Sequence, residues 1–193
     1  MLIKQYYNEH AQKFIEKTLD VDLKPIYEVF ESYLKPGIKL LDVGFGSGRD
    51  SLHFYKKGYS VVSIDYAEEI VARGKNFLDN EVLLVDFQEI EYENEFDAIW
   101  ASAVFMHFTD NAILQAMNIC HRALKANGYV YISFKYGENA ETRKGRYFND
   151  FTEDKFMKLF KSQQNFTVER VWITEDARTD HKCKKWVNII LKK

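Results

Sequence analysis

The residue types with the clearest chemical potential lie in a glycine-rich segment near the N-terminal quarter of the chain. Residues 39–50 read Lys-Leu-Leu-Asp-Val-Gly-Phe-Gly-Ser-Gly-Arg-Asp, an apolar run that breaks into glycines on alternate positions. This pattern predicts a buried strand, a tight turn and the start of a helix. Glycine lets the backbone approach a ligand closely, and the unpaired N–H groups of the following helix attract polar or anionic atoms. The segment is therefore a candidate cradle for a nucleotide-like cofactor.

The spacing of the glycines and of two later acids narrows the kind of cofactor. A dinucleotide-binding Gly-x-Gly-x-x-Gly motif would need glycine at position 49, where Arg49 stands. Asp65 ends an apolar run about 20 residues past the turn, which is the placement expected for a carboxylate that binds a ribose. Asp86 and Phe87 follow a third apolar run, at 82–85. Because parallel strands end at one edge of a sheet, these groups are expected to share one crevice.

The elements that must position these residues alternate along the chain. Apolar runs predict strands, and apolar residues at helical spacing predict amphipathic helices between them. This alternation predicts an α/β fold of the Rossmann-like type, with a mostly parallel seven-stranded sheet, helices on both faces and a C-terminal antiparallel hairpin. We expect one domain over 1–193. The expected strands are 38–43, 59–65, 82–85, 96–101, 129–134, 166–174 and 186–191, and the expected helices are 8–19, 23–34, 49–58, 67–73, 111–125 and 152–160, with Asn127-Gly128 as the stop of the fifth helix and a surface loop over 135–150.

From residue 6 to about residue 134 the chain resembles the class I S-adenosylmethionine-dependent methyltransferases, most closely the small-molecule enzymes of the type-11 and tellurite-resistance-like kind. The resemblance rests on the Gly-x-Gly-x-Gly turn and its Gly-Ser-Gly-Arg-Asp-Ser continuation. It implies S-adenosyl-L-methionine as cofactor and S-adenosyl-L-homocysteine as product. It also implies that Asp65 accepts from both ribose hydroxyls and Asp86 from the adenine amino group. The implied cofactor-binding residues are Tyr7, Gly44, Phe45, Gly46, Gly48, Asp65, Tyr66, Asp86, Phe87 and Ala101.

The acceptor side of the site is less defined by the sequence. His107, just after the fourth expected strand, is either a general base or a packing histidine that caps the loop before the next helix. We expect the helices of 1–35 to act as a lid, and the segments 135–150 and 175–185 to lie on the substrate side. Tyr136, Arg146 and Arg178 in these segments suit an anionic or aromatic small molecule, although a solvated charged loop explains the cations equally well. Asp42 either braces the glycine turn or contacts the cofactor, and Arg49 pairs with the cofactor or with a neighbouring acid.

Composition excludes several function classes and leaves others open. The 193 residues carry a net charge of -2, which argues against a protein held to nucleic acid by overall charge. The absence of a long apolar run and the two separate cysteines, Cys120 and Cys183, favour a cytoplasmic protein with reduced thiols. We also expect a monomer or a homodimer, and no metal site. A nicotinamide-dependent oxidoreductase is disfavoured by Arg49. The alternatives that stay open are methylation of tRNA or protein, and a non-catalytic S-adenosylmethionine-binding protein.

Overall fold

The computed structural model describes residues 3–74, 82–161, 163–178 and 184–193. Cys183 and the middle of the expected substrate-side segment 175–185 lie outside these residues. The described elements are the helices α1 (Ile3–Thr18), α2 (Lys24–Glu31), α3 (Arg49–Lys56), α4 (Glu68–Gly74), α5 (Asp110–Ala123) and α6 (Glu153–Phe160), the short 3-10 turns η1 (Phe87–Glu89) and η2 (Phe105–His107), and the strands β1 (Lys39–Val43), β2 (Ser60–Asp65), β3 (Val82–Leu84), β4 (Phe96–Ala101), β5 (Leu124–Lys135), β6 (Ala140–Arg143), β7 (Arg146–Asn149), β8 (Thr167–Glu175) and β9 (Lys185–Lys192).

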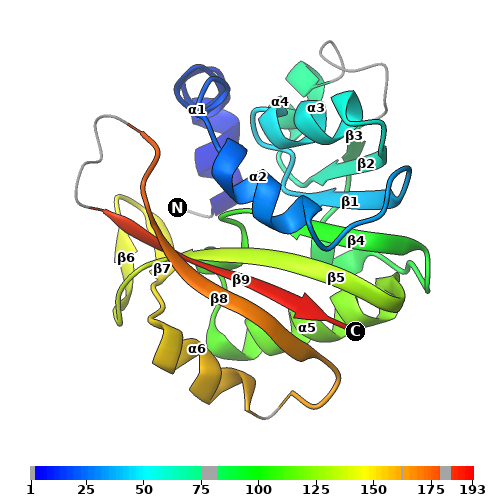
Figure 1. The fold of residues 1–193 in the computed structure, drawn as a ribbon. Coiled ribbons are helices and arrows are strands. Elements are labelled where there is room, and N and C mark those ends of the chain that lie inside the picture. Colours follow the sequence, from blue (N-terminus) through cyan, green and yellow to red (C-terminus); the bar gives the residue numbers. More distant parts are fainter. Residues whose placement is uncertain (1–2, 75–81, 162, 179–183) are drawn as a thin grey trace.

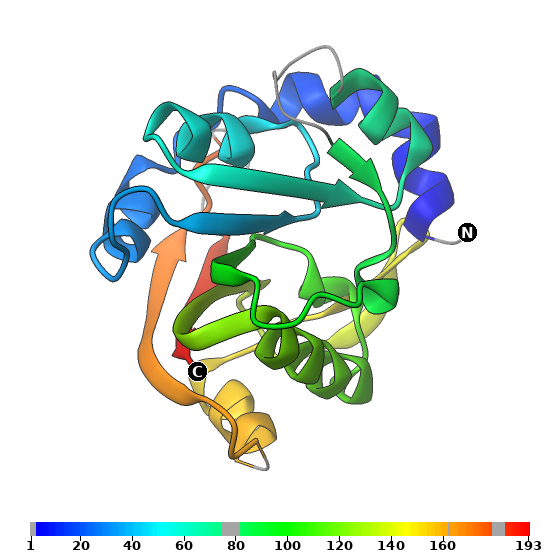
Figure 2. The same cartoon turned by 90° about the vertical axis from the view of Figure 1, so that its right-hand side faces the viewer.

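One twisted sheet organises the molecule (Figures 1 and 2). Its seven strands run in the order β3-β2-β1-β4-β5-β9-β8. The pairs among β1 to β5 are parallel, and β9 runs antiparallel to both β5 and β8. The expected Rossmann-like sheet with a C-terminal antiparallel hairpin is therefore confirmed. The parallel strands all point their carboxyl ends at the same edge, which is where such sheets hold ligands.

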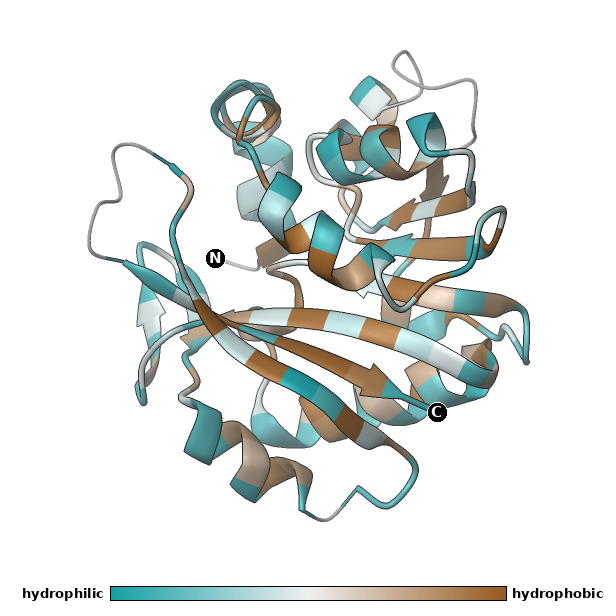
Figure 3. Ribbon diagram, viewed as in Figure 1, coloured by the Kyte–Doolittle hydropathy of each residue, from teal (hydrophilic) through white to brown (hydrophobic). Residues whose placement is uncertain are grey.

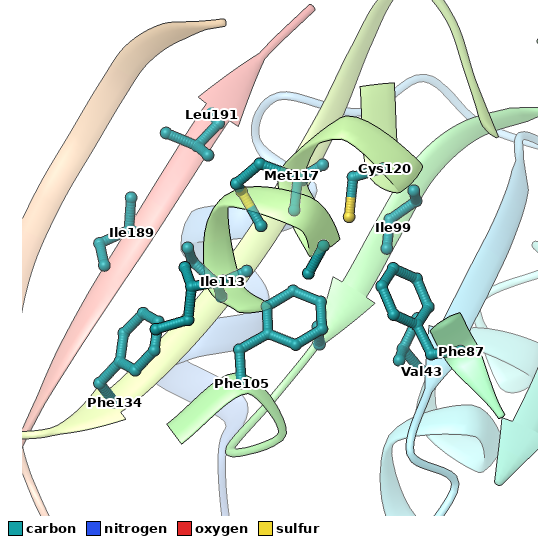
Figure 4. Packing of buried hydrophobic residues seen from close by; sticks show 14 of the residues in the cluster. Val43, Phe87, Ile99, Phe105, Ile113, Met117, Cys120, Phe134, Ile189 and Leu191 are labelled. Atoms are coloured by element: carbon teal, nitrogen blue, oxygen red, sulfur yellow. The ribbon is translucent and has the colours of Figure 1, made fainter. Parts of the chain in front are cut away.

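Neighbouring strands share their apolar residues between two faces of the sheet. Leu40 and Trp100 belong to the buried cluster that includes residues of α2 and α3, whereas Leu41 and Ile99 pack with α5 on the opposite face. Figure 4 shows Ile113, Met117 and Cys120 of α5 directed at the strands. Strand side chains alternate between faces, so a continuous apolar run is buried on both. The central strands are accordingly mostly brown in Figure 3, while the helices carry teal stretches.

The N-terminal helix α1 lies beside α4 at the rim of the sheet. Asn8 donates a 2.6 Å hydrogen bond to Glu68, and Lys4 forms a 2.6 Å ion pair with the same side chain. Ala11 is buried in a small cluster with Phe45 of the glycine turn. The helix begins at Ile3, earlier than the expected position 8, and its first turns are held by the Lys4–Glu68 ion pair and by packing of Tyr7 against the same cluster.

Two expectations about the C-terminal half are wrong. The fifth helix ends at Ala123, and β5 begins at Leu124, so Asn127, at φ +64°, lies within the strand segment and does not stop the helix. The segment 135–150 contains the antiparallel ribbon β6–β7 where a loop was expected. Lys144 and Gly145 join the two strands with φ of +50° and +76°, as a two-residue hairpin turn requires. The apolar signal was weak because β6 is mostly exposed.

Candidate active site

A pocket of about 330 Å³ opens at the carboxyl ends of β1, β2, β4 and β5. Residues of α1 and α2 and of the ribbon strand β7 complete its wall, and the volume is in the range of small-molecule sites. The pocket has two sides. One is formed by the glycine turn and the ends of β2 and β3, and the other by the ends of β5, β7, β8 and β9. We call them the glycine-turn side and the ribbon side.

The glycine turn is held in a conformation that other residues rarely adopt. Gly44, Gly46 and Gly48 have φ of +76°, +55° and +78°. A Cβ on Gly44 would lie 2.7 Å from Cγ2 of Val104, and one on Gly48 would lie 2.5 Å from the ring of Phe45. Glycine is therefore required at these positions both for backbone conformation and for space. Gly48 lies beneath the turn, against the buried Phe45 ring, and does not line the pocket.

Asp65, the last residue of β2, joins the turn to the pocket. Its Oδ2 accepts from the Gly46 N–H at 3.1 Å, and its Oδ1 accepts from the Ala67 N–H at 3.0 Å. Burial raises the pKa of this carboxyl, and the backbone hydrogen bonds act in the opposite direction. The Tyr66 N–H is a third backbone donor to this carboxylate, which can hold the turn and still keep acceptor capacity for a ligand hydroxyl.

The segment after β3 forms the next part of the glycine-turn side. The Oδ1 of Asp86 accepts from the Gln88 N–H at 2.9 Å and caps the short turn η1. The Phe87 ring is buried and packs against Phe105, with ring centroids 5.2 Å apart. Asp86, Phe87 and Tyr66 all line the pocket.

The polar residues around the start of α3 brace the site. Asp42 is buried and accepts a short hydrogen bond from Ser51, so its geometry is that of a residue that braces the turn. Asp50 accepts from Arg49 Nε at 2.6 Å, from Trp100 Nε1 at 2.8 Å and from the hydroxyl of Tyr27. Arg49 thus pairs with a neighbouring acid. Burial acts to raise the pKa of Asp50, but the Arg49 charge and these hydrogen bonds hold it below its ordinary value.

His107 sits between α1 and the ribbon. Its Nδ1 donates to the carbonyl oxygen of Tyr147 at 2.7 Å, which leaves Nε2 to accept from the Tyr7 hydroxyl at 3.2 Å. Burial lowers the pKa of His107 to about 4, and the nearby Arg146, Lys135 and Arg143 charges add to this effect. The ring is therefore a neutral imidazole that links helix α1 to strand β7.

The ribbon side gathers cations around one buried ring. Lys135 Nζ lies 4.3 Å from the centroid of the Phe148 ring, and the guanidinium carbons of Arg143 and Arg146 lie 4.6 Å and 5.1 Å from it. Arg178, which follows β8, forms a 2.5 Å ion pair with Asp176. Lys135, Arg146 and Arg178 line the pocket.

The structure brings most of the sequence-predicted residues to this one pocket. Its lining includes His107, Arg146 and Arg178, together with Tyr7, Gly44, Phe45, Gly46, Asp65, Tyr66, Asp86 and Phe87. Three others do not belong to the lining: Gly48 lies beneath the turn, Ala101 is fully buried in the core, and Tyr136 is 42% exposed on the ribbon's base. The roles of the lining residues remain predictions.

Sequence reasoning missed two parts of the pocket wall. Ala103, just after β4, has a φ of +58° and donates its N–H to Ser133 at 2.9 Å. This positive φ could not be predicted from the sequence, because the position is not a glycine. Lys135 and Phe148 were not singled out, since Lys135 ends a buried strand and Phe148 lies in the segment expected to be a loop. A cation at the carboxyl end of an apolar strand was the available signal.

Comparison with known proteins agrees with this geometry. Residues 41–132 match the family model described as a methyltransferase domain. A ubiquinone biosynthesis O-methyltransferase of Bradyrhizobium diazoefficiens is 28% identical over 102 residues, covering 50% of this chain and 40% of that protein. The N-terminal Xaa-Pro-Lys N-methyltransferase 1 of Rattus norvegicus is 27% identical over 127 residues, covering 58% of this chain and 57% of that protein. The chain thus spans about half the length of these relatives.

The fold match extends over nearly the whole chain. The 1,6-didemethyltoxoflavin-N1-methyltransferase of Burkholderia thailandensis, solved with its substrate and S-adenosylhomocysteine bound, superimposes with a TM-score of 0.82. The match covers 99% of this chain and 87% of that one at 17% identity, which shows the fold. The chain thus has the sheet order and fold of that methyltransferase, and its residues 41–132 match a methyltransferase domain.

Proposed function

We propose that this protein transfers a methyl group from S-adenosylmethionine directly to a small-molecule acceptor. The observation that carries the proposal is the meeting of the glycine turn, Asp65 and Asp86-Phe87 around one pocket. The pocket then continues to a wall of cations and aromatic rings, which gives an acceptor a place beside the cofactor. The relatives named above act on small molecules or on a protein terminus, and a pocket of about 330 Å³ favours the first class.

The residues present fit the cofactor. Gly44 and Gly46 line the pocket, and the Asp65 carboxylate keeps acceptor capacity for a ribose hydroxyl beside its backbone donors. Asp86 and the Phe87 N–H stand at the next strand end for the adenine ring. Of the ten residues that the resemblance implies, Gly48 and Ala101 act from behind this surface. When bound, S-adenosylmethionine supplies an electrophilic methyl carbon together with its leaving group.

The protein's main task is then to align the acceptor. Holding two reactants in line supplies on the order of 7–11 kcal/mol of a barrier. A general base works best with a pKa near the working pH. Because the pKa of His107 is about 4, we assign to His107 the positioning of Tyr7 and not proton abstraction. The acceptor atom is accordingly one that reacts without losing a proton in the slow step, such as a thiolate or a neutral amine.

The N-terminal helices serve as the lid of this single domain. Ile3, Tyr7 and Phe14 of α1 and Ile26 of α2 line the pocket. The ring of Tyr6 lies 4.1 Å from the Arg146 guanidinium, so α1 also contacts the ribbon. The ribbon and the residues after β8 then form the substrate side, in keeping with the role expected for 135–150 and 175–185.

Labelled methyl transfer tests the proposal. The protein is incubated with methyl-labelled S-adenosylmethionine and either a metabolite extract or total tRNA. We expect label in the small-molecule fraction, and Asp65→Asn should reduce it by an order of magnitude or more. Label only in RNA or in protein would refute the small-molecule assignment. No label in any fraction, with intact cofactor binding, would favour a non-catalytic binding protein.

A further inference from the structure

Two cations on the ribbon side, Lys135 and Arg146, form no ion pair with a carboxylate among the described residues, whereas their neighbours Arg143 and Arg178 do. Arg143 pairs with Asp150 at 2.5 Å, and Arg178 pairs with Asp176. Within the described ranges, no carboxylate lies within 4.0 Å of the charged nitrogens of Lys135 or Arg146. Both residues line the pocket. The ribbon side therefore presents two uncompensated positive charges to whatever the pocket holds.

The donor atoms of Arg146 are also incompletely used. Its Nε is fully buried and has no hydrogen-bond partner in the described structure. Leaving a buried donor without an acceptor is unfavourable, and more so for a charged group. The guanidinium carbon lies 4.1 Å from the Tyr6 ring centroid and 5.1 Å from that of Phe148, and the group also hydrogen-bonds the Tyr7 side chain, so Nε is the buried donor left over. A held guanidinium with an unused buried N–H is suited to receive an anionic oxygen.

Lys135 is held in a similar state. It ends β5 with its ammonium 4.3 Å from the Phe148 ring centroid, and Phe148 is itself buried. Burial, together with the charges of Arg143, Arg178, Lys184 and Arg146, lowers the pKa of Lys135 to about 8. Repulsion among these cations would be relieved by an anion placed between them.

The remaining walls indicate the size and shape of that anion's carrier. Aromatic side chains flank the cations: Phe148, Phe108 and Trp186 line the same side of the pocket. Asp176 and Glu175 also line it, so the excess of positive charge is small. A multiply charged phosphate ester is less suited to this balance than a singly charged group on a flat, apolar body.

We propose that the methyl acceptor is a small organic acid whose carboxylate binds between Lys135 and Arg146, with its body against Phe148 and Trp186. This inference rests on the proposed methyltransferase function and names its substrate class. It assigns Lys135 and Arg146 as specificity-determining residues, with no role in cofactor binding.

Matched pairs of acid and amide test the inference without knowledge of the true substrate. Protein saturated with S-adenosylhomocysteine is titrated at constant ionic strength with acetate or acetamide, and with benzoate or benzamide. Dissociation constants are measured together with the Arg146 Nε–Hε signal in ¹⁵N-arginine spectra, assigned by its loss in Arg146→Gln. We expect each acid to bind about tenfold or more tightly than its amide and to shift the Arg146 signal.

Three variants locate the effect. Arg146→Gln and Lys135→Met should each weaken acid binding about tenfold and leave S-adenosylhomocysteine affinity unchanged. Lys144→Gln removes an exposed cation at the turn of the same ribbon, outside the pocket, and should leave both affinities unchanged. Equal binding of acid and amide by the wild type would overturn the inference, whether or not the variants fold. Loss of S-adenosylhomocysteine binding by the wild type would instead contradict the proposed function.

Discussion

The two sides of the pocket differ in how their charged groups are satisfied. On the glycine-turn side, Asp65 accepts from the backbone N–H groups of Gly46, Ala67 and Tyr66, and Asp86 from that of Gln88, so each acid has a partner before any ligand arrives. On the ribbon side, Lys135 and Arg146 lie against the Phe148 ring and form no ion pair with a carboxylate in the part of the chain that the structure describes. The first side is preorganised for one fixed ligand. In our proposal the second side is completed by the acceptor, and this is where specificity is expected.

The largest effect on ligand affinity is expected from a substitution in the glycine turn. Gly44→Ala places a Cβ 2.7 Å from Val104 Cγ2 at φ +76°, so the turn must move. We expect S-adenosylhomocysteine affinity to fall by about a hundredfold or more, together with a lower melting temperature. Gly58→Ala is the matched control, because its φ is +84° but its Cβ would meet nothing within 4 Å. That variant should lose only about 1–2 kcal/mol of stability and keep full affinity.

The neutral His107 connects the two sides of the pocket, and its burial should make the free energy of unfolding depend on pH. Its pKa is about 4 in the folded protein against 6.5 for the ordinary side chain. The unfolded chain therefore binds more protons between pH 6.5 and pH 4, and the free energy of unfolding falls as the pH is lowered through that window. This contribution is on the order of 3 kcal/mol and should be absent in His107→Gln, which keeps a donor and an acceptor.

Denaturant titrations measure the free energy of unfolding of the wild type and of His107→Gln between pH 6.5 and pH 4. Subtracting one profile from the other removes the contribution of the carboxyl groups, because both proteins contain them. Identical pH profiles for the wild type and His107→Gln would contradict a buried neutral ring. Methyl transfer by the variant should stay within about tenfold of the wild type, and a much larger loss would restore the general-base role.

Asp65→Asn tests the glycine-turn side alone. The substitution removes a charged acceptor, and charged hydrogen bonds contribute about 1.5–3 kcal/mol each. We expect S-adenosylhomocysteine affinity to fall by about 10- to 100-fold while acetate affinity of the cofactor-free protein stays the same. Calorimetric titration of both ligands measures this separation, and a parallel loss of acetate binding would show that the two sides are not independent.

The smallest effect is a gain in stability on the ribbon side. The pKa of Lys135 is lowered to about 8 from 10.5, so the ammonium destabilises the folded state below pH 8, and stability rises with pH between the two values. Lys135→Met removes this penalty. Because the side chain is partly solvated, we expect the melting temperature at pH 7 to rise by only about 1–2 °C. An unchanged or lower melting temperature would argue that Lys135 already has a compensating partner.

Much of the glycine-turn side could be predicted from the sequence because its parts follow strand ends. The strand Phe96–Ala101 has the bounds expected for it, and Thr152 caps the last helix by accepting from Lys155. Asp65 and Asp86 likewise lie at the ends of apolar runs. Local patterns of this kind place residues that are close in sequence, and the parallel sheet then brings the strand ends together.

The ribbon side depends on contacts between distant segments and could not be predicted in the same way. Lys135 and Arg146 both lie against the Phe148 ring because β6 and β7 fold back beside the end of β5, next to the Tyr136–Phe151 bridge. The sequence of this ribbon is rich in charged residues and lacks an apolar period, and this pattern predicts a loop. Its strand character comes from the Lys144-Gly145 turn and from burial of Phe148 against His107 of η2.

The most direct test of the account is a calorimetric titration of the wild-type protein with S-adenosylhomocysteine and, separately, with NAD. The account predicts saturable binding of S-adenosylhomocysteine at one site per chain, weakened in Asp65→Asn, and no binding of NAD. Binding of NAD without binding of S-adenosylhomocysteine would contradict it.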